Sequence, residues 1–120
     1  MRKKTLVVGA SLKPTRYSYL AMNRLKEYAH DVVAIGLRQG EVSGIKIETE
    51  LINFKEVDTV TLYLNPIRQK TYYEYIVGLN PKRVIFNPGT ENPEFYKILK
   101  KAAIEAEVAC TLVLLSTNQY

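Results

Sequence analysis

The chain has 120 residues, of which 47% are hydrophobic, and a net charge of +5, which suits one folded domain with its own core. One cysteine, Cys110, and one histidine, His30, exclude an intramolecular disulfide and a His/Cys metal site. The longest apolar run, 108–115, is too short to span a membrane, and the N-terminus does not read as a signal peptide. We therefore expect a cytoplasmic protein without a metal site. Its basic residues are spread along the chain, so nucleic acid is not the partner we expect.

Strand and helix patterns alternate along the chain. Short runs of apolar residues predict strands at 6–9, 32–35, 45–47, 58–64, 83–86 and 108–115. Apolar stripes at helical spacing predict helices at 17–29, 66–79 and 93–106, with a single helical turn at 51–54 and a polar tail at 116–120. Two Asn-Pro pairs, at 65–66 and 92–93, have the residue types of a helix N-cap and first turn.

This alternation predicts a single α/β domain over residues 1–120. We expect a three-layer, Rossmann-like, doubly wound and mostly parallel sheet of five to six strands, in the order 3-2-1-4-5-6, with Ile45–Ile47 as a weak third strand. Ligands of such sheets bind at the carboxyl ends of the strands, where the strand order reverses. That crevice lies between Gly9 and Tyr63-Leu64, and the loops 10–16, 36–40, 64–66 and 87–90 converge on it.

The first strand leads into a turn with the features of a phosphate site. Gly9, Ala10 and Ser11 have small side chains, Lys13 and Arg16 are cations, and a helix starts near Tyr17. A helix N-terminus offers unpaired N–H groups and a partial positive charge, and Ser18 is placed to cap it. The turn is not a full Gly-x-Gly-x-x-Gly motif, and a tight connection without a ligand is the alternative reading.

Arg38, just after the second strand, helps to indicate which nucleotide would bind in the crevice. NAD-binding folds commonly place an acidic residue here, and this chain has none. An arginine suits a phosphate on the adenosine ribose, as in coenzyme A (CoA) or NADP, although an ordinary surface arginine fits equally well. We expect no catalytic residues, because His30 lies at the opposite edge of the sheet and Cys110 in a buried strand.

The quoted residues resemble a known family. The segment Val-Val-Gly-Ala-Ser-x-Lys-Pro-x-Arg-Tyr-Ser (7–18), the basic residue after the second strand, Val-Asp-x-Val at 57–60, the glycine at 89 and the late cysteine together resemble the small, stand-alone CoA-binding domain proteins. These are similar in fold to the CoA-binding domain of the succinyl-CoA synthetase α subunit. Two segments depart from the family pattern: Gly36-Leu37 stands in place of Asn-Pro, and Asn87-Pro88-Gly89 in place of Gln-x-Gly.

The resemblance implies a set of ligand-binding residues. The first loop would hold the phosphates, Arg38 the adenosine end, and residues after the middle and fourth long strands the rest of the crevice: Gly9, Ala10, Ser11, Lys13, Arg16, Ser18, Arg38, Tyr63, Asn65 and Gly89.

Three functions follow as hypotheses. The first is non-catalytic binding of CoA or an acyl-CoA, so that the partner is a small-molecule nucleotide cofactor. The second is a small NADP-binding oxidoreductase, or a subunit of an acyl-CoA enzyme. The third is an interaction protein with a vestigial nucleotide pocket, in which the tyrosine-rich helix 66–79 forms a homodimer.

Overall fold

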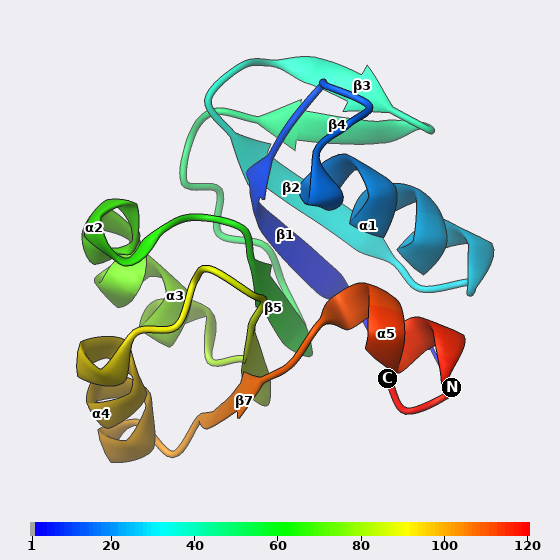
Figure 1. Ribbon diagram of the computed structural model, residues 1–120. Helices are drawn as coiled ribbons and strands as arrows, with labels where there is room; N and C mark the ends of the chain where they lie inside the picture. The colour runs from blue at the N-terminus through cyan, green and yellow to red at the C-terminus, as the bar shows by residue number, and fades with distance from the viewer. Residues whose placement is uncertain (1) are drawn as a thin grey trace.

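The computed structural model describes residues 2–120 and shows a seven-stranded sheet with helices on both faces (Figure 1). The strands are β1 (Thr5–Ala10), β2 (Val32–Gly36), β3 (Gly40–Val42), β4 (Ile45–Glu48), β5 (Thr59–Leu62), β6 (Arg83–Phe86) and β7 (Glu105–Val108). The helices are α1 (Tyr17–Glu27), α2 (Pro66–Gln69), the 3₁₀ helix η1 (Lys70–Tyr72), α3 (Tyr73–Leu79), α4 (Pro93–Lys101) and α5 (Thr111–Ser116).

The strand order is β3-β4-β2-β1-β5-β6-β7. Every neighbouring pair is parallel except β3 and β4, which form an antiparallel hairpin at one edge. The predicted Rossmann-like fold is therefore confirmed, and the predicted order 3-2-1-4-5-6 matches β4-β2-β1-β5-β6-β7 once the sixth strand is placed at residues 105–108; the sheet has one strand more than the five to six expected. The strand that the sequence did not indicate is β3, and the Ser43-Gly44 turn joins it to β4 with positive φ at both residues (50° and 80°).

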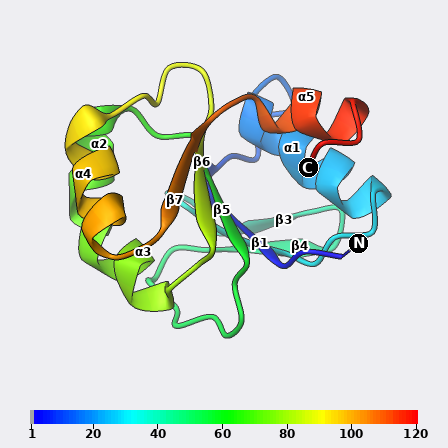
Figure 2. The same ribbon diagram turned by 90° about the horizontal axis from the view of Figure 1, so that it is seen from below.

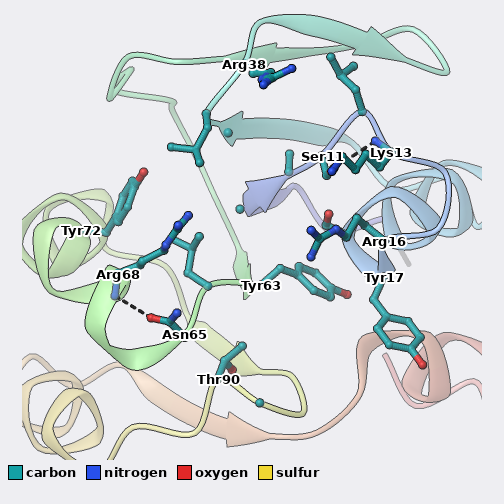
Figure 3. A pocket seen from close by; sticks show the side chains of 18 of the residues that line it. Ser11, Lys13, Arg16, Tyr17, Arg38, Tyr63, Asn65, Arg68, Tyr72 and Thr90 are labelled. Carbon is teal, nitrogen blue, oxygen red and sulfur yellow. Dashed lines mark hydrogen bonds between the residues drawn. The ribbon is translucent and has the colours of Figure 1, made fainter.

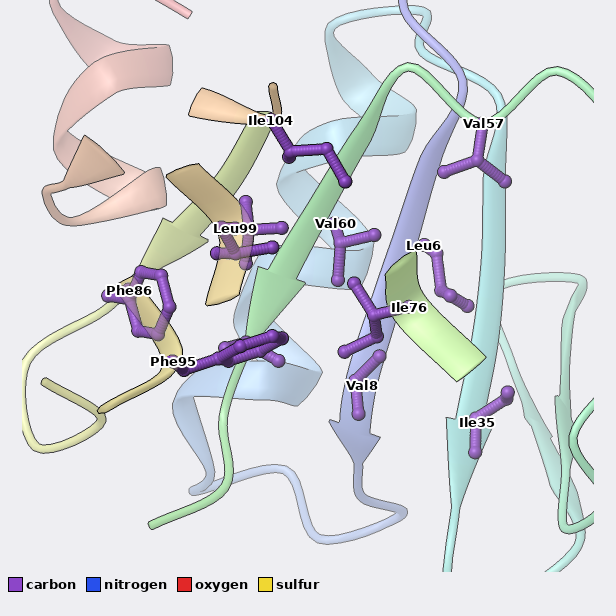
Figure 4. Packing of buried hydrophobic residues seen from close by; sticks show 12 residues of the cluster. Leu6, Val8, Ile35, Val57, Val60, Ile76, Phe86, Phe95, Leu99 and Ile104 are labelled. Carbon is purple, nitrogen blue, oxygen red and sulfur yellow. The ribbon is translucent and has the colours of Figure 1, made fainter. Parts of the chain in front are cut away.

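The core lies on both faces of the central strands. In β1, Leu6 and Val8 pack into one cluster with residues of α3 and α4, while Val7 packs on the opposite face with residues of α1 and α5. Figure 2 shows these two helical layers on either side of the sheet, and Figure 4 shows the first cluster. Parallel strands covered on both sides need apolar residues at successive positions, which explains the continuous apolar run at 6–8.

The prediction of a last strand at 108–115 is wrong. The strand is β7, over residues 105–108, and the apolar residues that follow form α5. The amide oxygen of Asn87 accepts a hydrogen bond from the backbone N–H of Thr111 at 2.8 Å, just where the helix begins. Leu115 then packs against the α1 side of the sheet. Cys110 is accordingly the N-cap residue of α5 and half-buried, rather than part of a buried strand.

Other helix predictions need correction. The helix predicted at 93–106 ends at Lys101, because Ala103 adopts a left-handed conformation (φ 59°) that reverses the chain and Ala106 belongs to β7. The helix predicted at 66–79 is divided into α2, η1 and α3, and residues 51–54 form no helical turn.

The end of the predicted polar tail is packed, since Arg83 donates to the backbone oxygen of Tyr120 at 2.9 Å.

No helix within residues 2–120 is both long and apolar enough to cross a membrane.

Candidate functional site

A cavity of about 480 Å³ opens at the carboxyl ends of β1, β2 and β5 (Figure 3). Four segments line it: the β1–α1 loop, the residues after β2, the connection from β5 into α2 and η1, and the loop after β6. All the residues predicted from the sequence lie on its wall, although they come from four separate parts of the chain: Gly9, Ala10, Ser11, Lys13, Arg16, Ser18, Arg38, Tyr63, Asn65 and Gly89.

Two glycines bring the strands together at this cavity. Gly9 has a φ of +92°, and a Cβ there would lie 3.0 Å from the carbonyl carbon and oxygen of Tyr63. A Cβ on Gly36 would lie 2.3 Å from the carbonyl oxygen of Ala10. Both glycines are therefore needed for close strand contact at the irregular end of β1.

The β1–α1 loop folds on itself before the helix begins. The hydroxyl oxygen of Ser11 accepts a hydrogen bond from the backbone N–H of Lys13 at 3.1 Å, and the N–H of Arg16 donates to the carbonyl of Lys13 at 3.0 Å. Arg16 is the N-cap residue of α1 and makes no side-chain capping bond. The expectation that Ser18 caps the helix is wrong, because Ser18 is buried inside the first turn. The backbone N–H groups of Tyr19 and Leu20 donate to the carbonyl of Arg16 at 3.1 and 3.2 Å, so among the described residues of that turn the free N–H groups are those of Tyr17 and Ser18.

Tyr63 follows β5 and lies on the cavity wall. Its backbone N–H donates to the carbonyl of Val8 at 2.9 Å, which fixes it beside β1. Burial of the phenol raises the pKa of Tyr63 to about 12. Its hydroxyl is therefore protonated near neutral pH and can donate or accept a hydrogen bond, but it is not a base.

A fully buried glutamine holds the α2 side of the cavity together. The amide nitrogen of Gln69 donates to the backbone oxygens of Leu64 and Thr90, both at 2.8 Å. Its amide oxygen accepts a hydrogen bond at 2.8 Å from Asn92, the N-cap residue of α4. Gln69 thus ties three segments together, and sequence reasoning missed it. One signal in the sequence pointed to a buried Gln69: it lies three residues before Tyr72, on the apolar side of the predicted helix 66–79.

Four cationic side chains line the cavity. Lys13, Arg16 and Arg38 were expected from the sequence, and Arg68 of α2 was not. The predicted N-cap at Asn65 was the signal for Arg68, because it places Arg68 in the first turn of a helix that starts beside the cavity. The side-chain oxygen of Asn65 accepts a hydrogen bond from the backbone N–H of Arg68 at 2.9 Å. Within residues 2–120 none of the four cations forms an ion pair, and none of the described lining residues is acidic. Four cations without an acidic partner on one cavity wall suit an anionic ligand.

Comparison with known proteins identifies the family. The model of the CoA binding domain family matches residues 3–116. The chain belongs to this CoA-binding domain family. A crystal structure of an uncharacterized protein superposes on the whole chain with a TM-score of 0.97 and 49% identity, covering 99% of that protein. A hypothetical protein from Pyrococcus horikoshii OT3 is 29% identical with a TM-score of 0.84, covering 96% of this chain and 82% of the other.

The fold also occurs inside a larger enzyme. The dinucleotide-forming acetyl-coenzyme A synthetase 1 of Ca. Korarchaeum cryptofilum, solved with phosphate and ADP, matches 91% of this chain and 26% of its own, with a TM-score of 0.72 and 16% identity. No curated protein matches the chain significantly.

The two departures from the family pattern have structural explanations in this CoA-binding domain. Gly36 is needed beside Ala10, as described above. Asn87 is buried and acts as a bridge: its amide nitrogen donates to the Thr61 hydroxyl at 2.7 Å and to the Leu62 carbonyl at 2.9 Å, while its oxygen accepts from Thr111. The loop after β6 is therefore fixed to β5 and α5.

The other titratable candidates lie outside the cavity. The ring nitrogen Nδ1 of His30 accepts a hydrogen bond from the backbone N–H of Lys3 at 2.9 Å, and burial is the main cause that lowers the pKa of His30. Neither His30 nor Cys110 is among the described residues that line the cavity. Within residues 2–120, no group of three or more His, Cys, Asp and Glu side chains could hold a metal ion.

Proposed function

We propose that this CoA-binding domain binds CoA or an acyl-CoA in the cavity without catalysing a reaction. The observation that carries the proposal is the set of unpaired cations Lys13, Arg16 and Arg38 around one cavity, in a chain of the CoA-binding domain family. CoA carries a diphosphate and a 3′-phosphate at its adenosine end, and these groups need cations and N–H donors.

Each positive group in this part of the cavity has a role in the proposal. Lys13, Arg16 and the free N–H groups at the start of α1 bind the diphosphate, since a helix N-terminus favours negative charge. Arg38, after β2, binds the phosphate on the adenosine ribose. The part of the ligand beyond the diphosphate crosses Tyr63 toward Asn65 and Gly89.

A binding role without catalysis agrees with the groups on the cavity wall. The phenol of Tyr63 stays protonated near neutral pH, and no carboxylate, histidine or cysteine is among the described lining residues. General acid–base catalysis most often uses a histidine or a carboxylate, and a serine nucleophile needs such a base beside it. NADP remains the competing ligand, because its 2′-phosphate suits Arg38 as well.

Calorimetric titration tests the proposal. We expect CoA to bind the native protein with one site, and Lys13→Ala with Arg16→Ala to raise the Kd by about 10- to 100-fold, since two charge-assisted contacts are lost. The matched control is Lys100→Ala with Lys101→Ala, which removes two exposed cations from α4 that are not among the described lining residues. This control should bind CoA as the native protein does.

Three results would count against the proposal. Absence of binding at millimolar CoA, in protein shown to be folded, rejects CoA as the ligand. Equal Kd values for the native protein and the Lys13/Arg16 double variant reject the β1–α1 loop as the phosphate site. Tighter binding of NADPH than of CoA favours the oxidoreductase hypothesis.

A further comparison uses dephospho-CoA, which lacks the 3′-phosphate of CoA. We expect the native protein to bind CoA more tightly than this analogue, and Arg38→Ala to abolish that preference.

A further inference from the structure

Arg68 lies apart from the other three cations of the cavity. Lys13, Arg16 and Arg38 belong to segments that follow β1 and β2, whereas Arg68 belongs to α2, which follows β5. Figure 3 shows the Arg16 and Arg68 side chains on opposite sides of the cavity, with Tyr63 below Arg16, Asn65 below Arg68, and Arg38 above both arginines. The positive charge is therefore divided among three places on the cavity wall: Lys13 and Arg16 at the β1–α1 loop, Arg38 after β2, and Arg68 on α2.

The backbone of Arg68 is held at this place by its neighbours, while its side chain is exposed at the cavity wall. The Asn65 side chain caps its backbone N–H, and the next residue, Gln69, is fixed to Leu64 and Thr90 by two hydrogen bonds. Tyr72, four residues later, lines the same wall and is half-buried. An unpaired guanidinium next to a phenol offers several hydrogen-bond donors in a small space.

The chemistry of CoA leaves Arg68 without a partner if the phosphates bind as proposed above. All the phosphates of CoA lie at its adenosine end, and the pantetheine arm that leads away from them is uncharged. Such an arm, passing from the β1–α1 loop across Tyr63, brings the sulfur end of the ligand to the α2 side. A guanidinium there pairs best with a carboxylate, which it can bind through two hydrogen bonds.

We propose, on the basis of the proposed CoA site, that the ligand is an acyl-CoA whose acyl group ends in a carboxylate, and that Arg68 binds this carboxylate with Tyr72 beside it. Arg68 is then the residue that determines acyl specificity, while Lys13, Arg16 and Arg38 bind the part common to all CoA thioesters.

Calorimetry with matched pairs of thioesters tests this proposal. Malonyl-CoA and propionyl-CoA have acyl groups of equal carbon number and differ in the terminal carboxylate, and glutaryl-CoA and valeryl-CoA form a longer pair. We expect the carboxylated member of at least one pair to bind about tenfold more tightly, as one charge-assisted contact implies. In Arg68→Met this preference should fall below about twofold, while the Kd of CoA itself stays within about twofold of the native value. Lys70→Met removes a neighbouring exposed cation outside the cavity lining and should keep the preference.

The outcomes separate this inference from the proposed function. Binding of CoA with no preference in either pair overturns the acyl specificity and leaves the CoA site intact. A loss of CoA affinity in Arg68→Met equal to the loss for the carboxylated thioester assigns Arg68 to the phosphates, which also overturns it. Failure of the folded native protein to bind any of these ligands rejects both proposals.

Discussion

Replacement of Gln69 by leucine tests whether one buried side chain holds the α2 side of the cavity in place. Leucine fills a similar volume but can neither donate to the carbonyls of Leu64 and Thr90 nor accept from Asn92. Each of the two carbonyls that loses its donor costs about 1–3 kcal/mol, together about 4 kcal/mol at the middle of that range, and the apolar side chain recovers about 1 kcal/mol. We therefore expect Gln69→Leu to lower the free energy of unfolding by about 2–4 kcal/mol.

Thermal and urea unfolding followed by circular dichroism measure this change. With an unfolding entropy of about 2 cal/mol/K per residue, a loss of about 2–4 kcal/mol lowers the Tm by roughly 8–16 °C in a domain of this size. The control is Lys70→Leu, an exposed neighbour that should change stability by no more than about 0.5 kcal/mol. A Gln69→Leu variant within about 1 kcal/mol of the native protein would refute the reasoning that this hydrogen-bonded cluster stabilises the cavity.

Three further predictions concern titration and backbone geometry. The pKa of Tyr63 is raised to about 12, so the stability that its protonated phenol contributes is complete below pH 10, the ordinary tyrosine value, and is lost as the pH rises toward 12. Absorbance at alkaline pH should show several late-titrating tyrosines, because burial also raises the pKa of Tyr75 and of Tyr120, and Tyr63→Phe should remove one of them; an unchanged titration curve contradicts this. Gly36→Ala should cost about 1–3 kcal/mol in urea unfolding, because its Cβ meets the Ala10 carbonyl, and a neutral result would be inconsistent with this packing. Gly78→Ala, in α3 with no heavy atom within 4 Å of the new Cβ, should instead stabilise by about 0.5–1 kcal/mol, and a lower Tm speaks against the assigned helix.

The fold could be predicted from the sequence where local signals and the parallel-sheet pattern agree. The apolar run at 6–8, the Asn-Pro helix starts and the alternation of strands and helices each specify their element without help from distant residues. The end of the chain could not be predicted in this way. Residues 108–115 have an apolar pattern that suits either a strand or a short helix, and the choice depends on Asn87, a residue far away in sequence.

Most of the candidate site could also be predicted from the sequence. The expected cavity residues follow strands or begin helices, so their positions depend on topology that the sequence reveals. Gln69 and Arg68 were missed because their roles depend on which side of α2 faces the cavity. That orientation results from the hydrogen bonds of Gln69 to Leu64, just before α2, and to Thr90, in the loop after β6. The hypothesis of an interaction protein relied on the tyrosines of the predicted helix 66–79. Three of them, Tyr72, Tyr73 and Tyr75, pack against the core of their own chain, which weakens that hypothesis. A homodimer stays a prediction.

The central claim, that the cavity binds CoA, is tested most directly by backbone amide NMR spectra recorded during a CoA titration. We predict saturable chemical-shift changes at Gly9 to Arg16, Gly36 to Arg38 and Gly89 to Thr90, the backbone segments that surround the cavity. No change at millimolar CoA, or changes centred on the far edge of the sheet at β7, would contradict the account.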